Sequence, residues 1–288
     1  MTAPHDGASD AGAPDADAAD ADAVLADAVR SAGAVARAAG VEIRQVDDLA
    51  GLTAVDRLWT EVWGGPALPV ELLRALAKAH GYVAAAYVDD RMVGACAGFF
   101  HAPAERALHS HVAGVCAEAS GRGVGFALKV HQRAWGLERD LDAITWTYDP
   151  LVARNAHFNL TKLGATVVEY LPNFYGAMPD AINRGDESDR VLVRWDLRDP
   201  RVAAACAPAG RVRPAEDAAP AGLVTVPVPA DIETLRTSDP AAARRWRTTV
   251  REGLLVPLSG GGRVVGFSGT GYLVRTAPTS ELTTEETA

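Results

Sequence analysis

The chain has 288 residues, of which 48% are hydrophobic, and a formal net charge of −9. Its length and apolar content allow one large domain or two moderate ones. The acidic balance argues against nucleic acid as a partner, and the absence of a long apolar run from the sequence argues against a membrane partner.

The N-terminus is acidic and rich in alanine, and residues 1–22 contain almost no large apolar side chain. Such a segment cannot offset the entropy lost on ordering. We therefore predict disorder over residues 1–40, with at most a short alanine-rich helix at 23–39. The segment does not read as a signal peptide, and three cysteines, an odd and sparse set, fit the reducing cytoplasm better than a disulfide framework.

From Val41 the hydrophobic spacing predicts a strand, two helices and three further strands. In the first helix, five apolar residues recur on one face: Leu52, Val55, Leu58, Trp59 and Val62. The turn residues Asp89 and Asp90 lie between two apolar runs and indicate a hairpin. The predicted elements are a strand at 41–46, helices at 49–63 and 70–81, and strands at 82–88, 91–100 and 106–115.

The next stretch begins with three alternating glycines that open a helix at about 122–139. A β-branched and aromatic strand follows, and Asp149 and Pro150 then predict the N-cap and first residue of another helix, which ends at Gly164. Two strands flank a long loop at 172–189. The predicted strands are 143–148, 165–171 and 190–197, so the order from Val41 is β-α-α-β-β-β-α-β-α-β-β.

The C-terminal part is predicted to be a separate small module. Residues 199–221 are rich in alanine, proline and arginine and indicate a linker. A strand, a helix and a hairpin are predicted within 222–275, and residues 276–288 are predicted to be a disordered tail. A module this short has too little core to be stable alone. We expect it to dock on the main domain or on a second chain.

The stretch ASGRGVGFALK, from Ala119 to Lys129, indicates an anion site. It fits neither the G-x-G-x-x-G fingerprint nor the P-loop motif. A strand, a glycine turn and a helix N-terminus nonetheless direct free backbone N–H groups towards an anion. The alternative is a tight turn between a strand and a helix, without a ligand.

The element order, taken with GVCAEASGRGVGFALK, resembles the GNAT superfamily of CoA-dependent N-acyltransferases over about residues 41–198. The narrower resemblance is to a bacterial branch of predicted GNAT acetyltransferases. It rests on ITWTYDPLVARNAHFNLTKLGA, YLPNFYGAM, NRG and DRVLVRW. The resemblance implies an α/β (α+β) fold: a mixed, mostly antiparallel sheet with splayed central strands and flanking helices, plus the small C-terminal α/β module.

The resemblance also implies a site for acetyl-CoA or another acyl-CoA as co-substrate, and no metal. The loop would wrap the pyrophosphate, the backbone of the preceding strand would pair with pantetheine, and the following helix would lie beside it. The implied cofactor-binding residues are Val115, Ala117, Ser120, Gly121, Arg122, Gly123, Val124, Gly125, Phe126, Asn155 and Phe158. Ser120 departs from the usual Arg or Gln. Asn155 is equally explained as a polar residue of a first helical turn, and Phe158 as a core residue.

A base is needed near the thioester, because a protonated amine has no lone pair. In many relatives a glutamate on this strand lies eleven residues before the Arg or Gln position, and the same count back from Ser120 gives His109. His109 is the first candidate and His111 the second, since alternate strand residues share a face. They could instead be hydrogen-bonded packing residues, or a metal pair, for which no third ligand follows. Leu160 replaces a tyrosine that often protonates the thiolate, so the acid is unassigned.

The loop at 172–189 is the candidate acceptor pocket, since such loops often set specificity. The candidate substrate residues are Asn173, Phe174, Tyr175, Asn183 and Arg184, of which Arg184 could hold a carboxylate bidentately. The alternative is a surface loop with buried aromatic anchors. The four arginines of RRWRTTVRE (244–252) indicate a solvated helix face, or a grip on the CoA 3′-phosphate or a partner.

The sequence therefore predicts an acyl-CoA-dependent N-acyltransferase, with an acetyl or succinyl donor and a small-molecule amine acceptor such as an amino acid. Direct attack is favoured, since Cys116 has no clear activating partner. The alternative is a catalytically inactive CoA-binding sensor or partner protein, to which the leucine at position 160 points. A homodimer is also compatible with the sequence.

Overall fold

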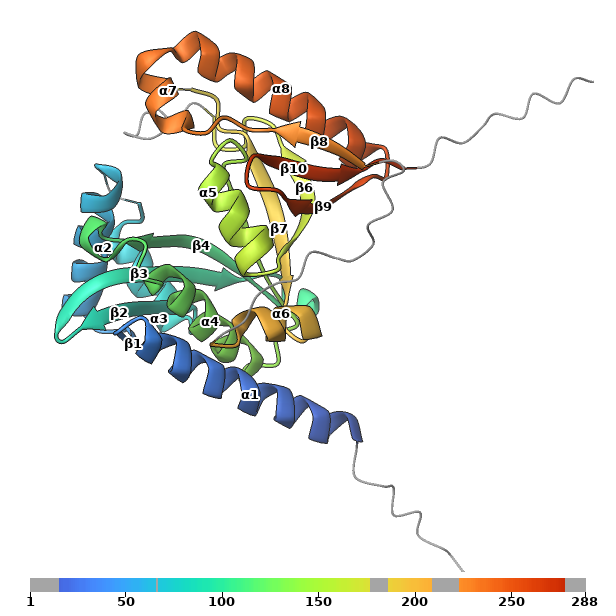
Figure 1. The fold of residues 1–288 in the computed structure, drawn as a ribbon. Coiled ribbons are helices and arrows are strands. Elements are labelled where there is room, and N and C mark those ends of the chain that lie inside the picture. Colours follow the sequence, from blue (N-terminus) through green and yellow to red (C-terminus); the bar gives the residue numbers. More distant parts are fainter. Residues whose placement is uncertain (1–15, 66, 177–185, 209–222, 278–288) are drawn as a thin grey trace, which may run out of the picture.

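The computed structural model describes residues 16–65, 67–176, 186–208 and 223–277 (Figure 1). In these residues a seven-stranded sheet has the order β1-β2-β3-β4-β5-β7-β6, and a three-stranded sheet has the order β8-β10-β9. All neighbouring strands are antiparallel except β4 and β5, which are parallel. The predicted fold class, a mixed and mostly antiparallel sheet with a small C-terminal α/β module, is confirmed.

The first half of the main domain follows the hydrophobic pattern closely. The second helix is capped by Asp48, whose side chain accepts from the N–H of Gly51, and it ends at Gly64 in the left-handed conformation. Its elements are β1 (Glu42–Gln45), α2 (Leu49–Trp63), α3 (Val70–Lys78), β2 (Tyr82–Val88), β3 (Arg91–Phe100), η1 (Pro103–Glu105), β4 (Ala107–Val115) and η2 (Ala117–Ala119).

The second half differs from the prediction at one helix. The helix expected to start at Asp149 and Pro150 begins only at Ala153, because the Asp149 carboxylate accepts from the N–H of Leu151 and from Arg236. The N-cap prediction for Asp149 is therefore wrong. The elements are α4 (Val124–Leu137), β5 (Ala143–Tyr148), α5 (Ala153–Ala156), the π-helical η3 (His157–Lys162), β6 (Thr166–Leu171) and β7 (Arg190–Asp196).

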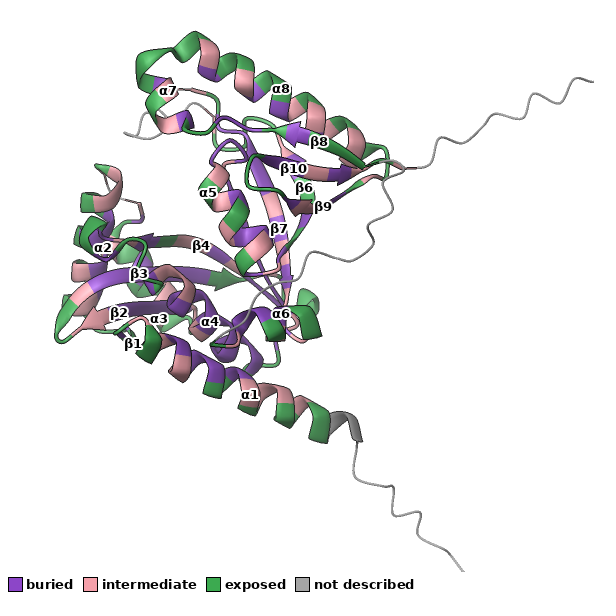
Figure 2. Ribbon diagram, viewed as in Figure 1, coloured by how far each residue is buried: buried purple, intermediate pink, exposed green. Residues whose placement is uncertain are grey.

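Helices cover both faces of the large sheet. The first hydrophobic cluster lies between the sheet and α2 and α3, and it includes Leu52, Trp59 and Leu73. The second lies on the opposite face, where α4 packs on the strands (Figure 1). Figure 2 shows that α4 is buried on most sides, and its polar residues Lys129, Gln132 and Arg133 are buried as well.

The burial of α4 is completed by an N-terminal helix, α1 (Ala16–Ala38), which packs along it. For residues 16–40 the structure thus corrects the prediction of disorder, because α1 is ordered and longer than the short alanine-rich helix expected at 23–39. Ala28, Ala32 and Val35 recur at helical spacing and are buried in the same cluster as α4. Small side chains let the two helices approach closely, so an alanine-rich stretch can form core without large apolar groups. Residues 1–15 lie outside the described part of the chain.

The first residues of the predicted linker at 199–221 form a helix. Helix α6 (Pro200–Cys206) is capped by Asp199, whose side chain accepts from the N–H of Arg201. Its buried residues, Val202, Ala205 and Cys206, lie on the side where α6 meets α1. Residues 209–222 lie outside the described ranges, so the linker stays a prediction there.

The C-terminal module consists of β8 (Leu223–Pro227), α7 (Ile232–Ser238), α8 (Pro240–Ser259), β9 (Arg263–Phe267) and β10 (Gly271–Arg275). The sequence pattern does not reveal α7. The module packs against β6 and η3 at one end of the large sheet (Figure 1). Its buried residues Val250, Leu254 and Tyr272 belong to the same hydrophobic cluster as the main domain, and the Tyr272 hydroxyl donates to the carbonyl of Pro150 at 2.9 Å.

Candidate active site

The centre of the large sheet opens between β4 and β5. These strands pair at only three positions, the last of which joins His109 to Thr145. Beyond it, β4 stays paired with β3 and β5 with β7. The β3–β4 register also shifts, because Ala97 faces Val112 while Gly98 faces Ser110, so β4 has one extra residue at His111. The backbone edges of β4 and β5 that face one another past His109 are therefore left without a strand partner.

The two predicted histidines lie on one face of this opening. The rings of His109 and His111 are 5.9 Å apart, and both contact the ring of Phe99, at 5.2 and 5.7 Å. A third histidine, His101, lies 6.1 Å from His109. Sequence reasoning missed it, although it stands at the end of β3, in the connection that turns directly into the strand carrying His109.

A hydrogen-bonded chain connects these groups to an acid. Nδ1 of His101 lies 2.9 Å from a carboxylate oxygen of Glu105, and its Nε2 lies 2.9 Å from the Thr145 hydroxyl. That hydroxyl lies 3.3 Å from Nδ1 of His109. One assignment of protons satisfies the whole chain when Glu105 is ionised. Nδ1–H of His101 donates to Glu105, the Thr145 hydroxyl donates to Nε2 of His101, and Nδ1–H of His109 donates to the Thr145 oxygen. Nε2 of His109 is then left with its lone pair.

Burial sets the charge of this face. It lowers the pKa of His109 to about 4, helped by the nearby positive charges that His111, His101 and Lys129 can carry. Burial likewise lowers the pKa of His111. Both rings are therefore neutral at pH 7, the state in which an imidazole can accept a proton.

The glycine loop joins the end of β4 to α4. Gly121 and Gly123 have φ of +75° and +85°, a region that favours glycine, and Gly123 is the N-cap of α4. The first N–H groups of a helix have no carbonyl one turn earlier. The side chains of Ser120 and Arg122 are exposed, Val124 is buried and Phe126 packs on the core, so a ligand at this loop would meet mainly backbone.

The other predicted cofactor residues lie at the end of β4, in η2 and in the α5–η3 helix. Val115 is half-buried and Ala117 is exposed. Asn155 lies in the first turn of α5, and Phe158 packs on the core cluster. The sequence did not single out Asn159, which is buried and accepts a hydrogen bond from Nε1 of Trp146 at 3.1 Å.

The candidate acceptor loop contacts β5 on the side that carries Thr145. Tyr175 OH lies 3.1 Å from the hydroxyl of Thr147, two residues beyond Thr145 and on the same side of β5. Phe174 stacks edge-on against Tyr175 at 4.7 Å, and both rings are about half exposed. The N–H of Tyr175 donates to Ser188, and the Asn173 side chain accepts from the N–H of Ser188, so the two limbs of the loop are joined. Asn183 and Arg184 lie outside the described residues.

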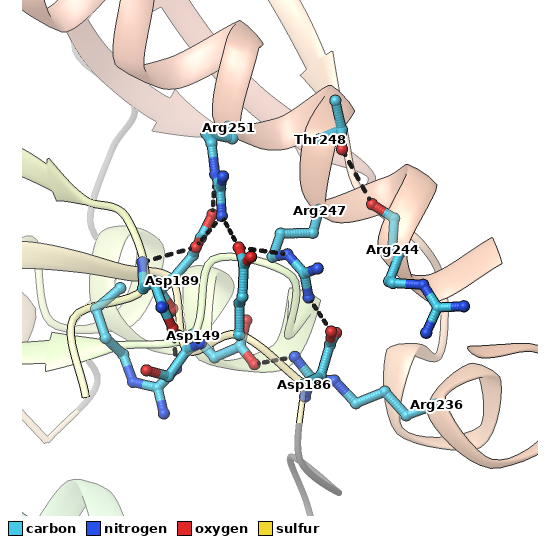
Figure 3. Close-up of polar contacts among 12 residues, drawn as sticks. Asp149, Asp186, Asp189, Arg236, Arg244, Arg247, Thr248 and Arg251 are labelled. Carbon is cyan, nitrogen blue, oxygen red and sulfur yellow. Dashed lines mark hydrogen bonds and ion pairs between the residues drawn. The ribbon is translucent and has the colours of Figure 1, made fainter. Parts of the chain in front are cut away.

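The arginines of α8 hold this loop (Figure 3). Arg251 donates to both carboxylate oxygens of Asp189, at 2.8 and 2.6 Å, and Arg247 pairs with Asp186. Arg236 of α7 makes a further buried pair with Asp149 at 2.6 Å. The prediction of a solvated helix face is therefore wrong for Arg247 and Arg251. Charge could have revealed these pairs, because the acidic stretch DESD precedes β7 and the arginines of α8 are basic.

Comparison of the sequence finds no matching family model and no matching curated protein. Solved structures do match. One is the ribosomal-protein-S18-alanine N-acetyltransferase of Escherichia coli, with 11% identity and a TM-score of 0.46, over 55% of this chain and 94% of that one. Another, described as a GNAT-family acetyltransferase of Desulfovibrio desulfuricans, has 16% identity and a TM-score of 0.45, over 55% and 99%.

A third match is an acetyltransferase structure from Salmonella typhimurium with acetyl-CoA, at 14% identity and a TM-score of 0.45, over 55% of this chain and 94% of that one. The matched proteins include GNAT acetyltransferases, the superfamily whose motifs this chain resembles. Matches at this level decide neither the reaction nor the bacterial branch.

Within the described ranges no group of three histidine, cysteine or acidic side chains is placed to hold a metal ion. None of the helices in those ranges has the length and apolar character needed to cross a membrane.

Proposed function

We propose that this chain is an acyl-CoA-dependent N-acyltransferase that acts on the amine of an amino acid or a similar small molecule. The observation that carries the proposal is the divergence of β4 and β5 directly after the His109–Thr145 pair. It leaves unpaired strand edge between a neutral histidine pair and the glycine turn that caps α4.

The residues of the loop fit a diphosphate. Two glycines with positive φ bring the chain into the N-terminus of a 14-residue helix, and a Cβ at Gly121 would meet nothing within 4 Å. Free N–H groups and the positive end of the helix dipole would face the anion. Ser120, Gly121, Arg122, Gly123, Val124, Gly125 and Phe126 would form this cradle, with Val115 and Ala117 pairing with the pantetheine arm and Asn155 and Phe158 beside it.

The histidine face supplies the base. The thioester of a bound acyl-CoA supplies the activated carbonyl. As the C–N bond forms, the attacking nitrogen must lose a proton, and Nε2 of His109 takes it. Thr145, His101 and Glu105 hold His109 in the tautomer that leaves Nε2 free. Tyr175 and Phe174 would line the acceptor side, and acetyl or succinyl groups are the donors to test.

Thiol release tests the function directly. The protein is incubated with acetyl-CoA or succinyl-CoA and a panel of amino acids, and free CoA thiol is followed. Turnover with an amine supports the proposal. The second candidate, a CoA-binding sensor without catalysis, is favoured by the buried Leu160, which provides no proton donor at that position. CoA binding without thiol release for any acceptor would support the sensor instead.

The loop assignment has its own test. CoA at one hundred times its dissociation constant should stabilise the native protein by about 2.7 kcal/mol, measured by thermal melts. Gly125→Asp should abolish most of this shift, because it places a negative charge at the helix N-terminus. A Cβ there would meet only Val115 Cγ2 at 3.8 Å, so the fold tolerates it. Gly125→Asn is the matched neutral control. Equal shifts in both variants would contradict the assignment.

A smaller effect is expected when the hydrogen-bonded chain from Glu105 through His101 and Thr145 to His109 is broken. Thr145→Val removes the hydroxyl that contacts both His101 and His109 while keeping the buried volume. It should lower turnover roughly tenfold, as expected for loss of the one hydrogen bond that orients His109. Thr145→Ser keeps the hydroxyl and should restore most of the rate. Steady-state kinetics decide the matter: equal turnover in the valine and serine variants would show that Thr145 does not position His109.

A further inference from the structure

A buried lysine lies where β4 and β5 separate, on the face opposite the histidines. Lys129 of α4 is only 4% exposed. Its Nζ is 3.1 Å from the Ser110 hydroxyl and 3.7 Å from the centre of the Trp146 ring. Ser110 and Trp146 are the residues that directly follow the last β4–β5 pair. The ammonium therefore lies at the apex of the opening, against both diverging strands.

This lysine has no counter-ion among the described residues. Lys129 Nζ contacts the Ser110 hydroxyl, the Gln132 amide oxygen at 2.7 Å and the indole rings of Trp146 and Trp195. The remaining side chain of this polar group is the neutral thiol of Cys96, which Gln132 and Ser110 contact at 3.5 Å. A buried cation without a carboxylate is costly. A negative charge that developed in the opening would relieve that cost.

Burial also favours loss of the proton. It lowers the pKa of Lys129 to about 8, well below the ordinary value for lysine. An acid in this range remains largely protonated at pH 7 and can still release its proton to a thiolate, whose ordinary pKa is about 8.5. Trp146 Nε1 donates a hydrogen bond to Asn159. This bond fixes the indole ring on which the Lys129 ammonium packs.

We propose that Lys129 is the general acid of acyl transfer. The inference rests on the proposed N-acyltransferase function. When the tetrahedral intermediate collapses, the C–S bond breaks and its electron pair goes to sulfur. Lys129 Nζ gives a proton to that sulfur and becomes a neutral amine, which regains a proton from water before the next cycle. The base, His109, and the acid, Lys129, thus act on one carbonyl from opposite faces of the sheet.

The test compares the native protein with Lys129→Met, which keeps the length and apolar volume of the side chain. Lys78→Met, on the exposed end of α3, is the matched control. Turnover at saturating acceptor is measured from pH 6 to pH 10, with CoA thermal shifts on each variant. We expect Lys129→Met to lose roughly 10²–10⁴-fold in turnover while keeping its CoA shift. We also expect the native alkaline limb near pH 8 to vanish, which a purely structural role would not cause.

Lys129→Gln guards against loss of folding, because its amide can still donate to Ser110 and Gln132 but is not an acid at these pH values. Native-like turnover in either folded variant, or an unchanged alkaline limb, would overturn the Lys129 assignment and leave the proposed function standing. If neither variant folds, absence of an alkaline limb in the native protein overturns the assignment. Absence of thiol release by the native protein would overturn both.

Discussion

Replacing His109 by alanine should lower the turnover of acyl transfer roughly 10²–10⁴-fold. In the proposed mechanism the imidazole accepts the proton of the attacking amine, and water in its place is a poorer and less well-placed base. The loss should fall on turnover, since the cofactor loop lies at the other end of β4 and does not involve His109. The CoA-induced thermal shift of the variant should therefore equal that of the native protein.

His111→Ala is the matched control, because it removes the neighbouring half-buried ring from the same strand. If His111 only packs, its variant should lose stability more than turnover. Single-turnover acylation of a good amine, with native and variant proteins shown to be folded and CoA-bound, gives the decisive comparison. Equal rates for the native protein and His109→Ala would remove His109 from the mechanism.

The buried site changes the expected pH dependence. An unperturbed histidine would give a rise in rate near pH 6–7. Burial and the neighbouring cations instead lower the pKa of His109 to about 4, so its acid limb in kcat/KM should lie near pH 4 and should disappear in His109→Ala.

The same shift affects stability, because the unfolded chain binds more protons than the folded one between about pH 4 and pH 6.5. The contribution of His109 should thus weaken the native fold as pH falls through this window and be absent above it. Denaturant melts at pH 5 and pH 7 should show a smaller difference in His109→Ala than in the native protein.

Local periodicity was enough to predict most of the helices and strands, whereas their arrangement in one sheet was implied only by the family resemblance. The five apolar residues of 49–63 define α2, and Asp89 and Asp90 define the β2–β3 hairpin, because spacing and turn chemistry act within a few residues. The least well predicted element is α1, of which only a short helix at 23–39 was expected. Its buried residues Ala28, Ser31, Ala32 and Val35 are small, and they become part of the core only through contact with α4, about a hundred residues away.

Part of the site could not be predicted from local periodicity. The apolar spacing of α4 predicts one buried face, and Lys129 and Arg133 fall outside it. Both are buried: Lys129 lies against Ser110 of β4 and Trp146 of β5, and Arg133 donates to the carbonyl of Leu197. His109 could be named because the family resemblance implies a base at its position on the strand, and His111 because alternate strand residues share a face. His101 and Thr145 could not, because only the β4–β5 register and the β3–β4 turn bring them to His109.

The second large effect is predicted at Asp189, where alanine should reduce the free energy of unfolding by about 3–5 kcal/mol. The Asp189 carboxylate is 2% exposed and accepts from Arg251, from Tyr170 OH at 2.5 Å and from the N–H of Asn173 at 2.9 Å. Its removal leaves the Arg251 guanidinium without this partner, and it leaves the buried Tyr170 hydroxyl and the Asn173 N–H unsatisfied. Glu187→Gln, which alters a more exposed partner of the same arginine, should cost less than about 1 kcal/mol.

A double-mutant cycle separates the contribution of the Arg251–Asp189 ion pair from that of the other hydrogen bonds of Asp189. Arg251→Met alone leaves a buried carboxylate, whereas Arg251→Met with Asp189→Asn removes both charges and keeps an acceptor for Tyr170 and Asn173. The double variant should be more stable than the sum of the two single effects predicts, because the main cost is an unpaired buried charge. Simple additivity in urea melts would show that Arg251 and Asp189 are not coupled.

The same network predicts an effect on the acceptor. Asp189 holds Asn173, and Ser188 holds Tyr175, so α8 fixes the limb of the loop that brings Tyr175 to Thr147. Asp189→Asn with Arg251→Met should therefore raise KM for the acceptor amine, with CoA binding unchanged, since no residue of the cofactor loop contacts this network. Burial would raise the pKa of Asp189, but the hydrogen bonds from Arg251 and Tyr170 outweigh it and lower the pKa. The stabilisation is thus present above about pH 4 and lost as pH falls through the lowered pKa, so kinetics at pH 7 report the intact network. An unchanged acceptor KM in the folded double variant would show that the module supports the fold without shaping the acceptor pocket.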